Sequence, residues 1–343
     1  MSTVRKQAAS VDTVAAGEVS LGRRVFRPQT LISFGIGVLI LIFGLSRLQI
    51  DLPGTLRVLG HANVLLLFAA FLVYYTTFPV RAIRWRLMLQ NAGCARESLP
   101  AVPGLMEIIY LSWFANSVVP AKLGDVYRAY LLRKRSAVTL SKAGGTIVAE
   151  RLIDFASLMV ILVVTGMLSF RGRLPGTVAT VLEAGAVGVL IGVVALFSMH
   201  RLDSIVRRFI PGRLHEIYDH FQEGTLGSFG AYPALLGLTV LAWGAEMGRL
   251  FLVTRAVGLA LSSNPVLDLL MAGFIALGAA LLTAPPGTPA GLGYVEATIS
   301  GALILFGANH TVAVSVALLD RSISFLSLVV IGFVVYLLSH RYA

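Results

Sequence analysis

The sequence predicts an all-α polytopic membrane protein with an inverted-topology repeat, in which about six full spans pack with two re-entrant helical hairpins that meet near the midplane. Three observations lead to this fold class. Of the 343 residues, 57% are apolar and only 13% are charged, and the mean hydropathy is +0.83. Several apolar stretches are long enough to cross a bilayer, and one five-residue phrase occurs twice, with Pro and Gly inside apolar sequence. A soluble domain of this length needs more polar surface, so that class is excluded.

The predicted spans are the apolar stretches that can cross a hydrocarbon core of about 30 Å at a helical rise of about 1.5 Å per residue. A polar segment, 1–30, precedes them and is expected to be a cytoplasmic tail. The first membrane repeat is expected over 31–170 and the second over 171–343, which includes a cytoplasmic amphipathic loop at 200–232. The six spans are expected at 31–49, 62–80, 143–169, 177–199, 234–257 and 312–338.

The repeated phrase marks the two predicted hairpins. It begins at Pro120 in the first half and at Pro289 in the second, and each copy precedes an arginine, Arg151 or Arg321, by nearly the same distance. A Pro/Gly break at membrane depth is tolerated where the backbone lines a cavity or is buried in protein, so both segments are predicted to be re-entrant. Two kinked spans without a functional role are the alternative. The hairpins are expected over 103–119 with 124–133, and over 265–284 with 293–306.

The distribution of Lys and Arg predicts the orientation, because cations in short loops mark the cytoplasmic side. They gather in the N-terminal tail and in the segments 81–100, 121–142 and 200–232, whereas the opposite loops hold few. Both termini are therefore expected in the cytoplasm, with the first hairpin dipping in from that side and the second from outside. The net charge of +11 would also suit nucleic acid, but that needs a soluble basic face, so no nucleic-acid partner is expected.

Charged residues inside the apolar stretches are the second signal. Each costs about 2.5–3.5 kcal/mol at a helix centre and needs a partner or water. Glu150 and Asp154 share one face of the third predicted span, with Arg151 about 100° around the helix. Glu246 and Arg249 can pair three residues apart in the fifth, most simply as a link between helices. These positions point to a polar interior between the two halves.

A known family shares this pattern of residues. The pattern consists of Asn116, Pro120, Gly124, Asp125 and Arg128, then Glu150, Arg151 and Asp154, then Pro289, Gly291, Gly293 and Glu296, and a late Arg321. Together with Arg81-x-x-Arg84-Trp85-Arg86, it resembles the lysylphosphatidylglycerol synthase transmembrane region, also called the flippase-like or UPF0104 family. The resemblance covers about residues 31–340 and implies a protein that moves a lipid between leaflets of the cell membrane. Because the sequence stops at Ala343, we expect a stand-alone member without the aminoacyl-transferase domain.

Together, the residues and the resemblance suggest a path for an anionic, phosphate-containing phospholipid or polyprenyl-linked lipid. Its headgroup would be gathered at the cytoplasmic face and received by the first hairpin, held near the midplane by two arginines, and balanced in the empty site by nearby acids. The gathering residues are Arg84, Arg86 and Lys122. Arg128 would receive the headgroup, with Asn116, Asp125 and the opened backbone around Gly124. Arg151 and Arg321 would hold it, and Gly291 and Gly293 of the second phrase also belong to the path. The balancing acids are Glu150, Asp154, Glu296 and Asp320.

Three other functions compete with lipid movement as interpretations of the sequence. An enzyme acting on lipid phosphate would need a nucleophile and a base, and the sequence offers no Ser/His or Cys/His arrangement for one, so no catalysis is expected. An ion-coupled small-solute transporter would share the inverted repeat, and a non-transporting partner of a lipid- or glycan-synthesising enzyme would share the membrane fold. The single Cys94 and the six scattered histidines predict neither a cofactor nor a metal site. The lipid, the energy source, the direction and the oligomeric state stay open.

Overall fold

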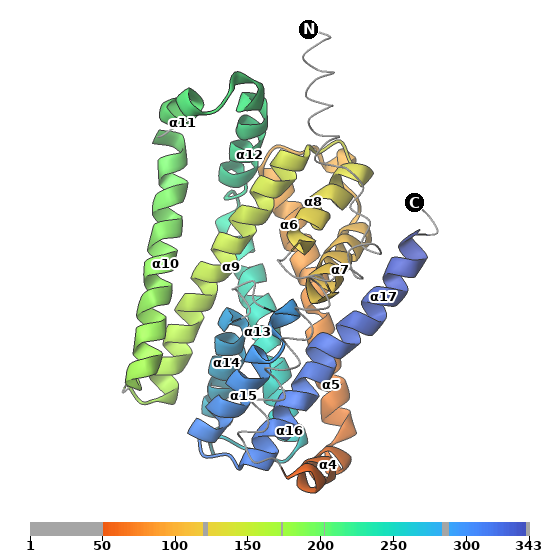
Figure 1. Ribbon diagram of the computed structural model, residues 1–343, viewed down its shortest axis with the longest axis vertical. Coiled ribbons are helices and arrows are strands. Elements are labelled where there is room, and N and C mark those ends of the chain that lie inside the picture. Colours follow the sequence, from red (N-terminus) through yellow and green to blue (C-terminus); the bar gives the residue numbers. More distant parts are fainter. Residues whose placement is uncertain (1–50, 119–122, 173, 202, 283–287, 341–343) are drawn as a thin grey trace.

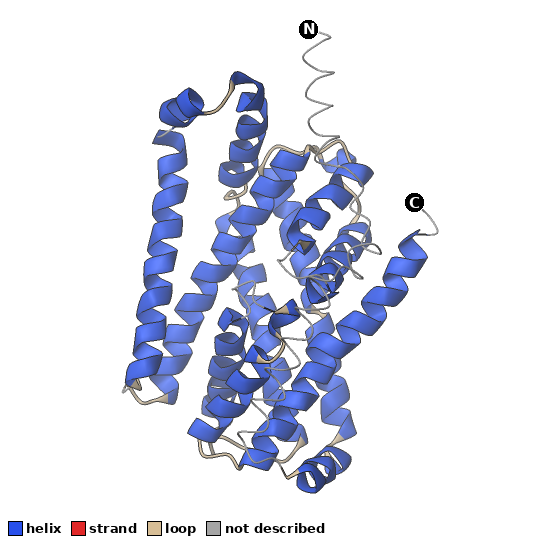
Figure 2. Ribbon diagram, viewed as in Figure 1, coloured by secondary structure: helices blue, strands red, loops and turns tan. Residues whose placement is uncertain are grey.

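The chain folds as a bundle of helices. The computed structural model describes residues 51–118, 123–172, 174–201, 203–282 and 288–340, and every regular element within these ranges is helical (Figure 2). The predicted tail, the predicted span 31–49 and Lys122 lie outside the described residues. Labels follow Figure 1 and begin at α4.

The described elements follow one another in this order along the chain: α4 (Leu52–His61), α5 (Val64–Tyr75), α6 (Thr77–Asn91), η1 (Arg96–Ser98), α7 (Val102–Val118), α8 (Gly124–Arg135), α9 (Leu140–Ser169), α10 (Gly176–Arg201), α11 (Asp203–Phe209), η2 (Gly212–Leu214), α12 (His215–Gly227), α13 (Tyr232–Ala256), α14 (Pro265–Leu282), η3 (Pro289–Gly291), α15 (Tyr294–Leu305), α16 (His310–Arg321), η4 (Ser322–Leu326) and α17 (Ser327–His340).

Six segments of the described chain are helical, long and apolar enough to cross a membrane. Five of them confirm predicted spans, and the sixth is α14, which has 18 residues and was predicted to be one arm of a re-entrant hairpin. The span predicted at 62–80 continues to Asn91, because Arg81 and Arg84 beyond it are buried against carboxylates. The six segments are Val64–Asn91, Leu140–Ser169, Gly176–Arg201, Tyr232–Ala256, Pro265–Leu282 and His310–Ser339.

Two short helix pairs lie in opposite halves of the molecule, beside the long helix α9. We call the half that contains α11 and α12 the upper half and the half that contains α4 the lower half (Figure 1). The helices α7 and α8 pack against each other in the upper half, and α14 and α15 pack against each other in the lower half (Figure 1). Both pairs also contact neighbours from other parts of the chain: α8 and α14 pack on α9, and α7 contacts η3.

Local sequence explains where two of these helices begin and why α12 packs closely on α9. The side chain of Asn63 accepts hydrogen bonds from the first turn of α5, and Asn309 does the same for α16. Glycine lets α12 lie close to α9, because a Cβ on Gly145 would come within 2.2 Å of the Phe221 carbonyl oxygen and one on Gly224 within 2.2 Å of the Lys142 carbonyl oxygen. The predicted amphipathic loop therefore includes a helix that is docked onto α9.

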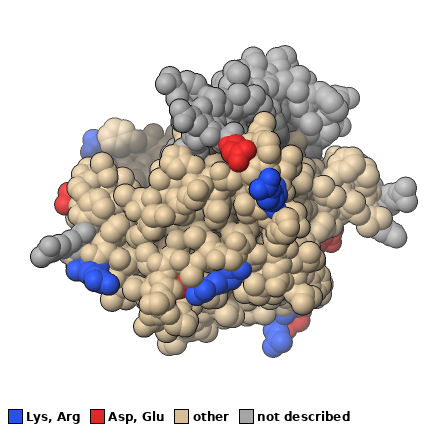
Figure 3. All heavy atoms as spheres, turned by 90° about the horizontal axis from the view of Figure 1, so that it is seen from below, with Lys and Arg blue, Asp and Glu red and all other residues tan. Residues whose placement is uncertain are grey.

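The outer surface of the described bundle exposes many large apolar side chains. Leu190, Ile191 and Phe197 of α10 are each more than half exposed, as expected for side chains that face hydrocarbon. The last turn of α8 carries three consecutive cations, Arg133 to Arg135. Figure 3 shows the molecule from below, where only scattered charged side chains are visible on the described surface.

A single π-helical turn joins the last two helices. Arg321 ends α16, the turn covers Ser322–Leu326, and α17 follows. Beyond the turn, α17 packs on α7, with the rings of Tyr336 and Phe114 6.2 Å apart. At Gly332 a Cβ would lie 2.7 Å from the Cβ of Phe114, so only glycine fits this contact. The second half of the chain thus closes against the first helix pair.

Candidate functional site

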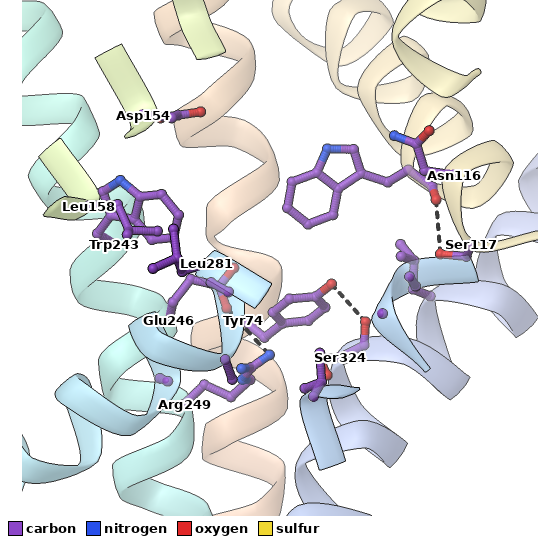
Figure 4. Close-up of a pocket in the computed structure, with 18 of the residues that line it drawn as sticks. Tyr74, Asn116, Ser117, Asp154, Leu158, Trp243, Glu246, Arg249, Leu281 and Ser324 are labelled. Atoms are coloured by element: carbon purple, nitrogen blue, oxygen red, sulfur yellow. Dashed lines mark hydrogen bonds and ion pairs between the residues drawn. The ribbon is translucent and has the colours of Figure 1, made fainter. Parts of the chain in front are cut away.

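A cavity of about 560 Å³ lies between the two helix pairs, and residues from both halves of the chain line it. Its wall is part apolar, with Leu158 and Leu281, and part polar, with Tyr74 and Asn116 (Figure 4). Eight charged residues belong to the lining, four basic and four acidic: Arg81, Arg151, Arg249 and Arg321, with Asp125, Asp154, Glu246 and Asp320. Charge at this depth needs a partner, and the partners divide into two groups.

The first group surrounds α9. We call it the α9 cluster, and it consists of Arg81, Arg84, Asp125, Arg128, Glu150, Arg151 and Asp154. Fully buried Arg84 is at its centre, donating to Asp154 Oδ1 at 2.6 Å and to Glu150 Oε1 at 2.9 Å. The other oxygen of Glu150 lies 2.8 Å from Arg128 Nη1, and the Arg128 guanidinium lies 3.8 Å from the centre of the Trp85 ring.

These contacts correct two expectations. Arg84 was expected to gather headgroups at the cytoplasmic face, but it is buried and forms ion pairs with Glu150 and Asp154. Arg128 was expected to receive the headgroup at the first hairpin, but it is 1% exposed and forms an ion pair with Glu150. Both arginines therefore bind α6 and α8 to α9 from behind the cavity wall, and neither lines the cavity.

Arg81 brings an aromatic element into the cavity. Its guanidinium carbon lies 5.0 Å from the ring centre of Trp113 and 5.6 Å from that of Trp243, within the range of cation–π attraction. Its Nη1 is 3.4 Å from Asp154 Oδ2. Arg81, Trp113 and Trp243 all line the cavity, so the two tryptophans hold a cation at its wall.

The two arginines that follow the repeated phrase have equivalent partners. Arg151 donates to Asp125 in the first turn of α8, 26 residues earlier, at 3.0 and 2.6 Å. Arg321 donates to Glu296 in the first turn of α15, 25 residues earlier, at 2.8 Å. The Arg151 side chain is 44% exposed although it lies within the bundle, and it lines the cavity. In each half, the arginine holds a carboxylate from the helix that follows the phrase.

The second copy of the phrase places its backbone around this ion pair. Ala290, Gly291 and Gly293 all have positive φ angles, of 47°, 68° and 88°, and glycine adopts such angles without strain. The turn directs the Gly293 N–H to Glu296 Oε2 at 2.7 Å and the Ala290 carbonyl to Arg321 Nη2 at 3.1 Å. A carboxylate thus occupies a position formed by a helix N-terminus and an arginine, a combination that binds anions. In the first copy, Asn116 accepts from the Gly124 N–H at 2.8 Å.

The second charged group lies around α13. We call it the α13 cluster, and it consists of Glu246, Arg249, Glu296, Asp320 and Arg321. Arg249 Nη1 lies 3.3 Å from Glu246 Oε2, and its Nε lies 3.0 Å from Asp320 Oδ1. Figure 4 shows Glu246 and Arg249 beside Tyr74, whose hydroxyl donates to the Ser324 carbonyl at 3.0 Å. Of the four acids expected to balance Arg151 and Arg321, Glu296 pairs with Arg321. Asp320 instead pairs with Arg249, and Glu150 and Asp154 pair with Arg84.

The two clusters differ in charge. Among the described residues, the α9 cluster has four arginines and three carboxylates, whereas the α13 cluster has two arginines and three carboxylates. The α9 cluster therefore has a surplus of positive charge and the α13 cluster a surplus of negative charge, whereas the charged residues that line the cavity balance, four basic against four acidic.

An apolar groove adjoins the cavity. It has a volume of about 420 Å³ and lies between α9, α10, α12 and α13. Leu152 and Phe155 of α9 line both spaces. At the outer edge of the groove, Phe197 is 76% exposed and Tyr232 is 59% exposed, so the groove opens toward the surroundings of the bundle.

Comparison with known proteins gives the family. The family model described as lysylphosphatidylglycerol synthase TM region matches residues 30–332. The chain belongs to this family. It is 31% identical to a UPF0104 membrane protein of Methanocaldococcus jannaschii over 66% of this chain and 95% of that protein. It is also 22% identical to a UPF0104 membrane protein of Pyrococcus horikoshii, over 79% of this chain and 86% of the relative.

A third relative of this family member is named as an enzyme. Glycosyltransferase AglD of Haloferax volcanii is 25% identical over 89% of this chain and 54% of its own length, so the chain spans about half of that relative. No solved structure matches the chain.

Most residues predicted for this family member either line the cavity or support it from behind. Asn116, Asp125, Arg151, Asp154, Gly291, Asp320 and Arg321 line the cavity. Arg84, Gly124, Arg128, Glu150, Gly293 and Glu296 support it from behind, Arg86 is half-buried away from it, and Lys122 lies outside the described residues. The cavity is also lined by residues that were not among the predicted site residues: Tyr74, Arg81, Trp113, Trp243, Glu246 and Arg249.

One signal for a missed residue was present in the sequence. Arg81 lies three residues before Arg84 and so shares its helix face. Within the described residues, no group of three or more His, Cys, Asp or Glu side chains is placed to hold a metal ion.

Proposed function

We propose that the protein moves an anionic, phosphate-containing phospholipid or polyprenyl-linked lipid between the leaflets of the cytoplasmic membrane. The observation that carries this proposal is that the charged cavity lies directly beside an apolar groove, with Leu152 and Phe155 lining both. A phosphate in the bilayer core needs paired donors, and a hydrocarbon chain needs apolar surroundings. A lipid is the ligand class that uses both spaces, whereas a small solute would use the cavity alone. The proposal assigns no catalytic step to either space.

We further propose that the two helix pairs are re-entrant hairpins of an inverted repeat. The pairs α7–α8 and α14–α15 lie in opposite halves, and Arg151–Asp125 and Arg321–Glu296 have nearly the same spacing. The upper end, with the cations at the end of α8, would face the cytoplasm. Rocking of one half against the other would then open the cavity to either side.

The proposed step is an exchange of anions on the two arginines. A headgroup phosphate would displace Asp125 from Arg151, the more exposed of the two arginines, and then Glu296 from Arg321. When Glu296 leaves, the Gly293 N–H and the Arg321 guanidinium together become available to a phosphate oxygen. Each released carboxylate either reaches water and keeps its charge or takes up a proton and becomes neutral, so exchange requires an open cavity.

The test is lipid translocation in proteoliposomes with headgroup-labelled phosphatidylglycerol and a labelled polyprenyl phosphate. Arg151→Gln and Arg321→Gln each remove one charge-assisted contact of about 1.5–3 kcal/mol, so each should slow translocation at least tenfold. Arg207→Gln is the matched control, because Arg207 is also ion-paired, with Asp203 and Asp219, but lies outside the cavity lining. Wild-type rates in both cavity variants would refute the proposal.

A second candidate function is favoured by the relative named as a glycosyltransferase, which the chain matches over 89% of its own length. On that view the protein is a membrane partner of a lipid- or glycan-synthesising enzyme and moves nothing itself. The same proteoliposomes separate the two candidates, because a non-transporting partner would leave both labelled lipids in their original leaflet.

A further inference from the structure

The α13 cluster has more negative than positive charge and is closed off from bulk solvent. Asp320 is 0% exposed and the Glu246 side chain 13% exposed, and the two share the guanidinium of Arg249. Within the part of the chain that the structure describes, Asp320 Oδ2 has no hydrogen-bond partner, although Asp320 lines the cavity. A buried carboxylate oxygen without a donor is costly, so this oxygen calls for a ligand.

The neighbouring charged and titratable groups do not supply that ligand. On the helices packed against α13 and α16, five such groups are already paired or hydrogen-bonded to another partner. These groups are Tyr74 of α5, which donates to Ser324; Arg81 of α6, which pairs with Asp154 of α9; Asp268 of α14, which pairs with Arg255; Glu296 of α15, which pairs with Arg321; and His61 of α4, which bonds Arg57 of its own helix. The cluster therefore keeps three carboxylates for two arginines.

A proton fits this place better than a metal cation. A sodium ion would need several oxygen ligands and would stand beside the Arg249 guanidinium, whose Nε is 3.0 Å from Asp320 Oδ1. A proton on one carboxylate removes the surplus negative charge without a coordination shell. It reaches the carboxylate through the same cavity that Asp320 and Glu246 line.

We propose that Asp320 and Glu246 share an exchangeable proton and that its uptake and release couple lipid movement to the proton gradient. This coupling rests on the proposed lipid transport. When a phosphate displaces Glu296 from Arg321, the lower wall gains negative charge, which favours binding of a proton from the open side. When the phosphate leaves to the other side, Glu296 returns to Arg321 and the proton is released there. Lipid anion and proton thus cross together, one for one.

The first experiment measures the proton itself, without transport. Infrared difference spectra of the purified protein, recorded as the pH is varied, should contain a protonated carboxyl band that is lost in Asp320→Asn or in Glu246→Gln. Glu107→Gln, which changes a carboxylate paired with Arg135 outside the cavity lining, is the control and should keep the band. A spectrum without such a band, or a band that survives in both cluster variants, would overturn the proton site.

The second experiment measures coupling in the proteoliposomes. With one proton for each lipid, a gradient of one pH unit should produce an asymmetry of about tenfold in labelled phosphatidylglycerol between the leaflets. The variant Asp320→Asn should show the same distribution with and without the gradient. If wild-type protein moves lipid but ignores the gradient, the coupling is wrong and the proposed function stands. If it moves no lipid at all, the proposed function fails, and the infrared result still decides the proton site.

Discussion

Replacing Arg84 with methionine should cause a large loss of stability, because this side chain is the centre of the α9 cluster. It makes four hydrogen bonds, two to Asp154 and one each to Glu150 and Thr239, and it has no exposed surface. Breaking a buried ion pair by removing one partner costs about 3–5 kcal/mol. Arg81 and Arg128 remain near the two carboxylates, at 3.4 and 2.8 Å, so the lower end, about 3 kcal/mol, is expected.

The assay measures unfolding in mixed detergent micelles and extrapolates the free energy of unfolding to micelles without denaturing detergent. Arg135→Met is the matched control, because Arg135 forms an ion pair with Glu107 in which both side chains are 32% exposed, and such a pair contributes about 0–1 kcal/mol. Arg84→Met combined with Asp154→Asn should cost less than the sum of the two single changes, since the partners are in contact. If Arg84→Met costs no more than Arg135→Met, the assigned role of the buried cluster is wrong.

Two further predictions concern packing and pH. In Gly124→Ala the new Cβ would lie 2.1 Å from the Ser112 carbonyl oxygen, between α7 and α8. The free energy of unfolding should therefore fall by about 1–3 kcal/mol in the same assay. Gly144→Ala is the control and should be tolerated, because nothing lies within 4 Å of its new Cβ. The hydrogen bond from Lys142 lowers the pKa of Glu223. This link between α9 and α12 therefore stabilises the fold above about pH 4.3, and the stabilisation is lost as the pH falls and the carboxylate is protonated. Unfolding of Glu223→Gln against wild type should therefore show a small difference at neutral pH that disappears in acid; a difference that persists in acid would contradict this assignment.

The membrane class and most spans could be predicted because hydropathy over a window is a property of the sequence alone. Even so, the span that begins near residue 62 was ended too early, at the first of its arginines. Arg81 and Arg84 can stay at membrane depth because Glu150 and Asp154 approach them from α9. The window could not include partners that lie 66 and more positions away.

The region of the candidate site could also be predicted, but its ion pairs could not. Glu150 and Arg151 are adjacent in sequence, so their side chains point about 100° apart and face different helices. Glu150 therefore meets Arg84 and Arg128, whereas Arg151 meets Asp125. Which helix stands opposite each face depends on packing between the two halves, and no local pattern in the sequence contains that information.

The π-helical turn at Ser322–Leu326 sets the rotational phase of the last helix. Such a turn accommodates one residue more than an α-helical turn, and each residue after it is therefore rotated by about 100° relative to an uninterrupted helix. This rotation brings Gly332 and Tyr336 onto Phe114. Deleting one residue from the turn would regularise the helix and turn both contacts away, although composition and hydropathy would hardly change. The length of this one turn decides whether the end of the chain fits against α7.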